Sequence, residues 1–237
     1  MEFNVKKCSV MEFGKSKNRI SGIYNLGDKE VKKVEFEKDL GVVITNDMTP
    51  DKQINKIIGE TYNLLRSIKV AFAYMDEEMV KKILITMIRP RLEYAAILWS
   101  PSTKKNIRKL ERIQRATTKL APELSELTCE ERLSKLELPT LEQRRERGDL
   151  LTIYRIMKNM EILDREDLLI WDTRNTRGHG KKLKKDNYRR DVKRNSFPHR
   201  VVDVWNNLDE KIVCAKTIHE FKTNLDNMRY GDRTPRA

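Results

Sequence analysis

The most apolar part of the chain, residues 79–99, predicts a buried helix. Its apolar residues recur at the three- and four-residue spacing of one helix face, so that face should pack into a core. Pro90 has no backbone N–H, and we expect it to kink or end this helix before a second apolar run. The predicted buried face consists of Val80, Ile83, Leu84, Met87 and Ile88.

Residues 104–119 predict a helix of the opposite character, with a thin apolar stripe around Leu110 and a dense cationic face. Ser102 or Thr103 can cap its start, and it should stop before Pro122. A buried helix followed by a basic one indicates a helical module that holds positive charge towards an anion. The cationic face consists of Lys104, Lys105, Arg108, Lys109, Arg112, Arg115 and Lys119.

The first 46 residues have the short apolar runs and turn residues of β-structure. Gly27 and Asp28 can form a hairpin turn. The run from Leu40 to Thr45 is nearly continuously apolar, which is typical of a strand buried on both faces. The expected strands lie at 8–13, 20–26, 31–36 and 40–45.

Helix start signals follow in the rest of the chain. Thr49 predicts the N-cap of a helix reaching residue 73, and Asp76 should cap the next helix. Three capping boxes predict three more helices. The chain is therefore predicted to be α+β and mostly α, with a small antiparallel β-structure at the N-terminus followed by a helical bundle. The boxes pair Thr128 with Glu131, Thr140 with Gln143, and Thr217 with Glu220.

The composition adds a strong positive charge. Lys and Arg number 49 against 36 Asp and Glu, a formal net charge of +13. The excess favours RNA, DNA or an RNA–DNA hybrid as a partner, although a helical protein with solvated charges would have the same composition. No apolar run is long enough to span a bilayer, and three widely spaced cysteines indicate no disulfide framework. We expect an intracellular protein without membrane contact.

Residues 172–200 are a second basic region, predicted to be a loop or a poorly ordered arm because apolar residues are nearly absent. The glycines beside His179 would let the backbone approach a phosphate, but a flexible loop would also contain them. Tyr188 can stack on a base, or it can only hold the arm to the body. The candidate nucleic-acid-binding residues are Lys104, Lys105, Arg108, Arg112, Arg115, Lys119, Arg177, His179, Lys181, Lys182, Lys184, Lys185, Tyr188, Arg189 and Arg190.

No catalytic or metal-binding pattern is present in the sequence. It contains no Gly-x-x-x-x-Gly-Lys-Ser/Thr phosphate loop and no Gly-x-Ser-x-Gly nucleophile elbow. The histidines have no metal-ligand spacing with one another or with a cysteine. Asp164, Glu166 and Asp167 could hold a metal, but a solvated loop is the better interpretation. We therefore assign no catalytic residue, no metal and no cofactor.

One family resemblance covers nearly the whole chain. Arg89-Pro-Arg-Leu-Glu-Tyr-Ala-Ala-Ile-Leu-Trp-Ser-Pro, followed by Leu110-Glu-Arg-Ile-Gln-Arg-Ala-Thr-Thr-Lys, resembles the region after the polymerase palm in jockey-like non-LTR retrotransposon reverse transcriptases. Other stretches match that family in the same order. They are Lys7-Cys-Ser-Val-Met-Glu-Phe-Gly, Lys38-Asp-Leu-Gly-Val, Leu141-Glu-Gln-Arg-Arg-Glu-Arg-Gly-Asp-Leu, Thr176-Arg-Gly-His and Arg200-Val-Val-Asp-Val-Trp-Asn-Asn-Leu.

The resemblance implies a β remnant of the polymerase palm at 1–46, a thumb-like helical module at 47–121, and a helical C-terminal region at 122–237 with the basic loop at 172–200. The family's RNA-directed DNA polymerase uses adjacent aspartates to bind Mg²⁺, and this sequence has no Asp-Asp pair. We therefore expect a reverse-transcriptase segment that is not itself an enzyme and retains at most nonspecific RNA or DNA binding. The family would place it in the nucleus or in a cytoplasmic ribonucleoprotein, with a partner protein as one source of the missing palm surface.

Two alternatives remain open. A helical protein-interaction module would expose Trp99, Trp171 or Trp205 as anchors, because the palm against which a thumb packs is missing. A non-functional relic of a decayed element would keep the same motifs without activity.

Overall fold

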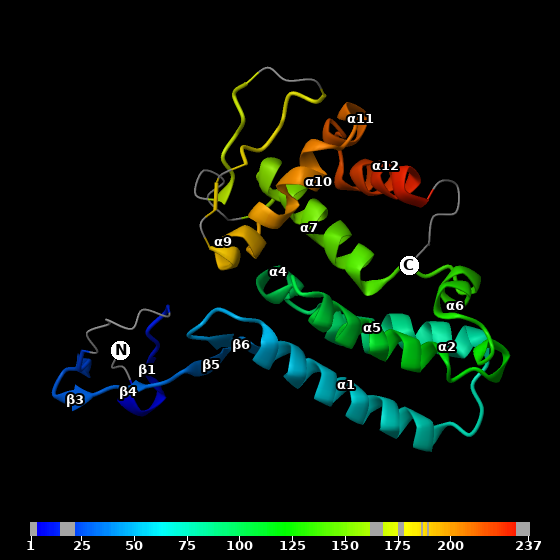
Figure 1. The fold of residues 1–237 in the computed structure, drawn as a ribbon, viewed down its shortest axis with the longest axis horizontal. Coiled ribbons are helices and arrows are strands. Elements are labelled where there is room, and N and C mark those ends of the chain that lie inside the picture. Colours follow the sequence, from blue (N-terminus) through cyan, green and yellow to red (C-terminus); the bar gives the residue numbers. More distant parts are fainter. Residues whose placement is uncertain are drawn as a thin grey trace.

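β-structure precedes a series of helices in the computed structural model, as predicted (Figure 1). The structure describes residues 4–14, 22–161, 168–174, 178–185, 187–188 and 190–230. The strands are β1 (Ser9–Val10), β2 (Asn25–Leu26), β3 (Lys29–Glu30), β4 (Lys32–Lys33), β5 (Phe36–Asp39) and β6 (Val42–Thr45). The α-helices are α1 (Asp51–Ala71), α2 (Glu77–Ile83), α3 (Arg89–Glu93), α4 (Ala96–Trp99), α5 (Lys104–Thr118), α6 (Cys129–Lys135), α7 (Leu141–Met157), α9 (Asp191–Asn195), α10 (Val202–Asn206), α11 (Glu210–Val213) and α12 (Ile218–Tyr230). A π-helical segment, η2 (Leu84–Ile88), joins α2 to α3, and 3₁₀ turns lie at Val5–Lys7, Pro122–Leu124 and His199–Val201.

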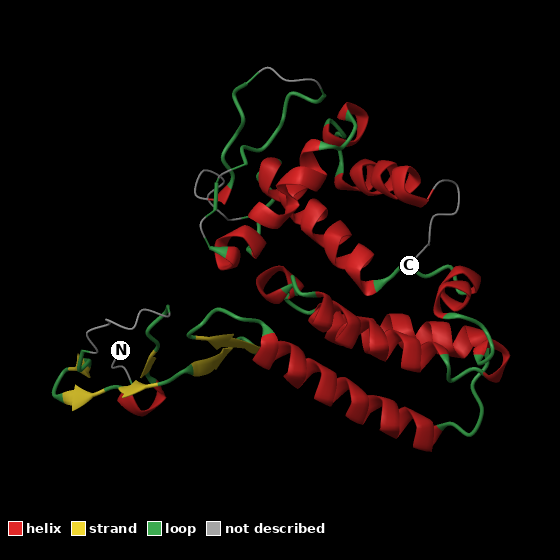
Figure 2. Ribbon diagram, viewed as in Figure 1, coloured by secondary structure: helices red, strands yellow, loops and turns green. Residues whose placement is uncertain are grey.

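The described β-structure consists of three two-stranded pairings (Figure 2). β2 and β3 pair in antiparallel fashion across the predicted turn at Gly27 and Asp28. β5 and β6 form a second antiparallel hairpin, and β1 adds a short parallel pairing with β4. The protein is thus mostly α, with small antiparallel hairpins near its N-terminus, as the sequence indicated.

The strand expected at 40–45 is two residues shorter and is not buried on both faces. Leu40 and Gly41 form the turn between β5 and β6 with φ angles of 44° and 88°, as a tight two-residue hairpin requires. Val42 is 4% exposed, but Leu40 is 84% exposed and Ile44 is 39% exposed. The apolar run lies on a hairpin that packs on the helices through one face only, so its other side chains face solvent.

Pro90 does not end the helix in which it lies. The preceding π-helical turn lets the Arg89 N–H donate to the carbonyl of Leu84, five residues earlier. This change of hydrogen-bond period accommodates the proline, and α3 continues to Glu93.

The helix starts depend on local capping, and most of the predicted caps are confirmed. Asp76, Thr103, Thr128 and Thr140 each accept a backbone N–H at the start of their helix. The Thr49 cap is wrong: α1 begins after Pro50 without a side-chain cap, and the Thr49 hydroxyl donates to Asp47 Oδ1 at 2.9 Å. At α12 the Thr217 hydroxyl accepts the Glu220 N–H, but the Glu220 carboxylate accepts the N–H of Lys216 and not that of Thr217.

Two hydrophobic cores meet along α7. The first contains residues from Val42 to Leu141, and the second contains residues from Leu150 to Leu225. The change between them falls within α7, so α6 and the first turn of α7 pack with helices α1 to α5. Trp99 and Trp205 are 4% and 0% exposed. Neither is the exposed anchor that an interaction module would present, because each fills one of these cores.

The described residues of the basic loop are tied to the second core, which favours the loop over the poorly ordered arm that the sequence also allowed. Trp171 and Leu183 form an antiparallel bridge. The Asn206 side chain accepts the Leu183 N–H and donates to its carbonyl, both at 2.8 Å. Leu183 is only 2% exposed. Leu183 is buried, and its backbone N–H and carbonyl are both hydrogen-bonded. These contacts fix this part of the segment, although its polar composition is typical of disorder.

Candidate nucleic-acid interface

Six cationic side chains lie on the outer side of α5, and we call them the α5 stripe. They recur every three or four residues along much of the helix, and all six are exposed. Leu110 and Ile113 on the other side are fully buried in the first core. Over 15 residues the stripe spans about 22 Å at 1.5 Å per residue. Its members are Lys104, Lys105, Arg108, Arg112, Arg115 and Lys119.

The charges of the α5 stripe have no internal partner among the residues that the structure describes. In the described part of the chain, none of its six side chains forms an ion pair or a side-chain hydrogen bond. Lys109, on the flank of the same helix, instead donates to Asn55 Oδ1 on α1 at 2.9 Å. The structure therefore leaves the outward charges available to an external anion.

A hollow of about 520 Å³ lies where the second half of the stripe meets the start of α6. Arg112, Arg115 and Lys119 line one side of it, and Arg132 lies on the other. Arg132 is 2% exposed. Its Nε donates to Thr118 Oγ1 at 3.0 Å and its Nη1 donates to the Leu127 carbonyl, so this fourth cation is held in place.

Arg132 is not among the residues that the sequence pattern indicated. It lies in the short helix α6, whose sequence is rich in charged residues like that of a solvent-facing helix. Nothing in the neighbouring sequence indicates that Arg132 is buried. Only the packing of α6 against α5 brings its guanidinium beside Arg112 and Arg115.

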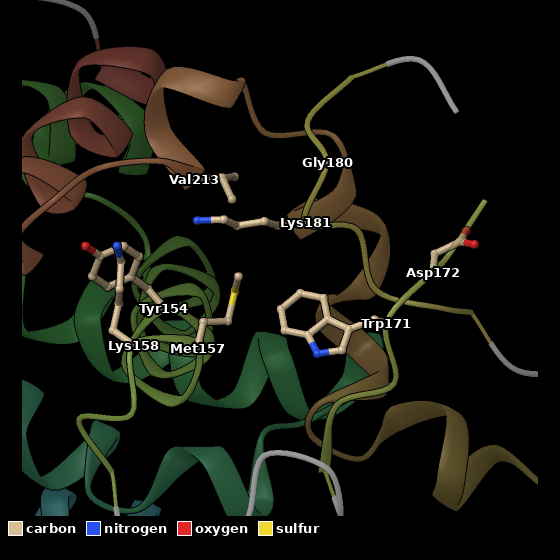
Figure 3. A pocket seen from close by; sticks show the side chains of 8 residues that line it. All are labelled: Tyr154, Met157, Lys158, Trp171, Asp172, Gly180, Lys181 and Val213. Atoms are coloured by element: carbon tan, nitrogen blue, oxygen red, sulfur yellow. The ribbon is translucent and has the colours of Figure 1, made fainter. Parts of the chain in front are cut away.

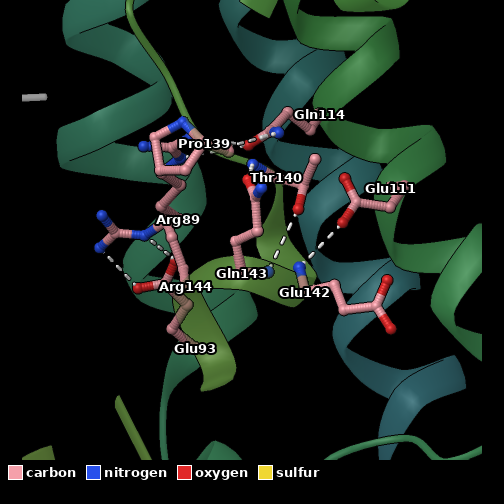
Figure 4. Close-up of polar contacts among 9 residues, drawn as sticks. All are labelled: Arg89, Glu93, Glu111, Gln114, Pro139, Thr140, Glu142, Gln143 and Arg144. Atoms are coloured by element: carbon pink, nitrogen blue, oxygen red, sulfur yellow. Dashed lines mark hydrogen bonds and ion pairs between the residues drawn. The ribbon is translucent and has the colours of Figure 1, made fainter. Parts of the chain in front are cut away.

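Buried polar contacts hold the inner side of α5 against the neighbouring helices (Figure 4). Arg89 is 1% exposed, and its Nε and Nη2 both donate to Gln114 Oε1 at 3.1 Å. Its Nη2 also donates to the Pro139 carbonyl at 2.7 Å, which the Gln114 amide reaches at 3.2 Å. Arg89 thus joins α3, α5 and the segment before α7.

A second set of contacts joins α5 to the start of α7. Glu111 Oε1 accepts the backbone N–H of Glu142 at 3.0 Å (Figure 4). Burial raises the pKa of Glu111. Burial lowers the pKa of Arg145, and the nearby Glu111 carboxylate opposes that lowering because it favours the protonated guanidinium. Arg144 binds both carboxylate oxygens of Glu93. The Glu111 contact thus holds α5 against α7, and the Arg144–Glu93 pair holds α3 against α7.

The basic loop differs from α5, because several of its candidate residues form ion pairs or hydrogen bonds with other residues of the chain. The Lys185 ammonium lies 2.5 Å from Asp203 Oδ2. The Tyr188 hydroxyl lies 2.6 Å from His199 Nδ1, and its ring lies 4.5 Å from the His199 ring, which favours the role of holding the loop to the body. Lys184 and Arg190 are exposed, and Lys181 and Lys182 are partly buried. Arg177 and Arg189 lie outside the described residues.

The His179 side chain lies inside the protein and not on its surface. It is 1% exposed, and its Nε2 lies 3.0 Å from the Trp205 carbonyl. Its Nδ1 accepts the Lys181 N–H at 3.2 Å. The side chain is an internal anchor of the loop, because both ring nitrogens are used within the chain.

The described residues contain no group of three or more His, Cys, Asp or Glu side chains arranged to hold a metal ion. Among the same residues, no helix is both long and apolar enough to cross a membrane. Comparison with protein-family models, curated proteins and solved structures finds no match to this chain.

Proposed function

We propose that this chain binds RNA, DNA or an RNA–DNA hybrid without sequence preference through the α5 stripe. It would do so as a segment of a jockey-like non-LTR retrotransposon reverse transcriptase. The observation that carries the proposal is that six exposed cations lie along one helix without a partner in the described chain. The ordered family motifs support the assignment to a reverse transcriptase.

The physical basis of binding is the release of counterions from the phosphate backbone. Neighbouring cations on a helix face lie about 5–6 Å apart at their Cβ atoms, so several can reach one strand of phosphates. The outer face of α5 contains no aromatic residue that could stack on a base. Contacts to phosphates alone position a nucleic acid but do not read its sequence.

The chain is proposed not to be a polymerase. Polymerase chemistry needs paired carboxylates that hold two divalent ions, and the sequence has no Asp-Asp pair. Mg²⁺ would belong to the complete family enzyme and not to this segment. Nucleic-acid binding would place the chain in the nucleus or in a cytoplasmic ribonucleoprotein.

The test is the affinity of the purified chain for an RNA–DNA hybrid across a salt series. If all six cations meet phosphates, log K should fall against log[salt] with a slope of about −5. A primer-extension assay with Mg²⁺ on the same sample should give no product. Absence of hybrid, duplex and single-strand binding at low salt would overturn the proposal and favour a relic.

A protein-interaction surface is the second candidate, and the β5–β6 turn favours it. Leu40 is 84% exposed and Tyr94 is 57% exposed, and the Tyr94 hydroxyl donates to the Leu40 carbonyl at 2.9 Å. These two side chains lie close together on the surface, and apolar patches larger than this pair mark protein contact sites. Substitution of Leu40 by Ser should abolish any self-association seen by light scattering, and an unchanged mass would count against this candidate.

A further inference from the structure

A cavity of about 300 Å³ opens in the second core, among residues that the α5 stripe does not include (Figure 3). This volume lies at the lower end of the range of small-ligand sites, which is about 300–1,000 Å³. The end of α7, the bridged segment around Trp171, the loop before Leu183 and α11 surround it. The lining residues are Tyr154, Met157, Lys158, Trp171, Asp172, Gly180, Lys181 and Val213.

One wall of the cavity is apolar and fixed in place. Tyr154 is 1% exposed, its ring stacks on Phe221 at 4.3 Å, and its hydroxyl donates to the Ala215 carbonyl. Trp171 is positioned by its bridge to Leu183. Figure 3 shows the Trp171 indole on the same side of the cavity as Met157. Together they offer a flat aromatic surface with a flexible thioether beside it, which suits a planar ring.

Two lysines bring positive charge to the same cavity. The Lys181 backbone is fixed on both sides, because its N–H donates to His179 and its carbonyl accepts from Trp205 Nε1 at 2.9 Å. Lys158 is the C-cap residue of α7, and its Nζ lies 5.6 Å from the Tyr154 ring centroid. Neither ammonium group forms an ion pair or a hydrogen bond with a described residue.

The one acid that lines the cavity does not neutralise these lysines. Asp172 accepts from Arg174 through both carboxylate oxygens, at 2.9 Å and 2.8 Å. These bonds lower the pKa of Asp172 to about 2. In Figure 3 its carboxylate points away from Lys158 and Lys181. The cavity therefore combines two available positive charges with an apolar aromatic wall.

We propose that this cavity binds a nucleotide, with the base against Trp171 and Met157 and the phosphate between Lys158 and Lys181. Stacking accepts any base, and the two ammonium groups can both donate to one phosphate. The ligand would be either a free mononucleotide or the terminal nucleotide of a single strand, since both present a base and a phosphate. The inference does not rest on the proposed function of α5.

The experiment is calorimetric titration of the full chain carrying Arg108→Gln, Arg112→Gln and Arg115→Gln, which removes much of the α5 charge. The probes are AMP, adenosine, inorganic phosphate and a 5′-phosphorylated oligoadenylate. AMP or the oligonucleotide should bind at least about tenfold more tightly than adenosine or phosphate. Lys158→Gln and Lys181→Gln should each weaken that binding about tenfold, since each removes one charge-assisted hydrogen bond.

Lys184→Gln is the matched control, because Lys184 is an exposed lysine of the same loop that does not line the cavity. It should leave binding unchanged. Lysine-dependent binding of AMP supports a free nucleotide as the ligand, and lysine-dependent binding of the oligonucleotide alone supports a strand terminus. Unchanged affinity in the Lys158→Gln, Lys181→Gln double variant overturns the inference, as does phosphate binding as tightly as AMP. Either failure leaves hybrid binding by the unmodified α5 stripe intact.

Discussion

The α5 stripe and the basic loop at 172–200 have similar runs of Lys and Arg in sequence, but the structure uses them differently. On α5 none of the six stripe side chains has an internal partner in the described chain. In the loop, Arg174 binds Asp172 and Lys185 binds Asp203. In α9, within the same basic region, the Lys193 ammonium lies 5.6 Å from the Tyr188 ring centroid. A run of positive charge is therefore a candidate binding surface only where the fold leaves its side chains unpaired.

The difference follows from the backbone. A helix with one buried face must project the residues of its other face into solvent, because its period fixes their direction. A loop has no such period, and its polar groups turn to whatever partner the nearby core offers. His179 shows this most clearly, since both of its ring nitrogens are used inside the protein.

The largest expected effect separates the two regions directly. Arg108→Gln, Arg112→Gln and Arg115→Gln together should weaken hybrid binding about 500-fold at 0.1 M salt, and the salt slope should become less steep by about 2.7, because three phosphate contacts are lost. Fluorescence anisotropy across a salt series measures both quantities.

The matched control removes three charges from the loop instead, through Arg174→Gln, Lys184→Gln and Lys185→Gln. Its effect should be far smaller, because two of these cations already bind acids within the chain. Equal losses from the two triple variants would show that only net charge matters and would end the distinction between the regions.

Asp149→Asn tests the buried pair that fixes the end of the loop. Asp149 is 7% exposed, and both its oxygens accept from Arg200, at 2.7 Å and 2.8 Å. Burial raises the pKa of Asp149, and the Arg200 bonds oppose that rise. Removing the charge leaves a largely buried guanidinium without its carboxylate, so urea denaturation should show a loss of about 3 kcal/mol. Asp203→Asn, at an exposed pair, should change stability by less than about 0.5 kcal/mol.

His179→Ala should lower the free energy of unfolding by about 2 kcal/mol, because it leaves a cavity and an unpaired Lys181 N–H. Amide hydrogen exchange at residues 181–185 should become faster. Hybrid affinity should not change. A loss of affinity with unchanged stability would instead restore His179 as a phosphate contact.

The smallest expected effect comes from the acid titration of Asp172, whose pair with Arg174 we call the Asp172 clamp. Because the folded pKa of Asp172 is about 2, below its ordinary 3.8, the clamp contributes stability above pH 3.8 that is lost as the pH falls towards 2. Carboxyl NMR should find this low midpoint, and Arg174→Gln should return it towards 3.8. An ordinary midpoint in the unmodified protein would mean that Arg174 is as unpaired as the cations of α5.

The sequence by itself determined the local features of this protein. Helix period and capping chemistry depend on residues three or four positions apart, so the outward face of α5 and the caps at Asp76, Thr103, Thr128 and Thr140 could be predicted. The two-residue Leu40–Gly41 turn also depends on local conformation, but it lies within an apolar run that predicted a strand. A hydrophobic pattern does not show how many faces of a hairpin are covered.

Only the tertiary structure decided which charges remain available. Three contacts show this: Lys185 pairs with Asp203, His179 is buried against Trp205, and Arg132 lies beside the α5 stripe. Each of them joins segments that are separate in the sequence and that only packing brings together. The division of the two cores within α7 and the cavity between Lys158 and Lys181 are of the same kind. Such contacts form where packed surfaces happen to meet, and no local spacing encodes that meeting.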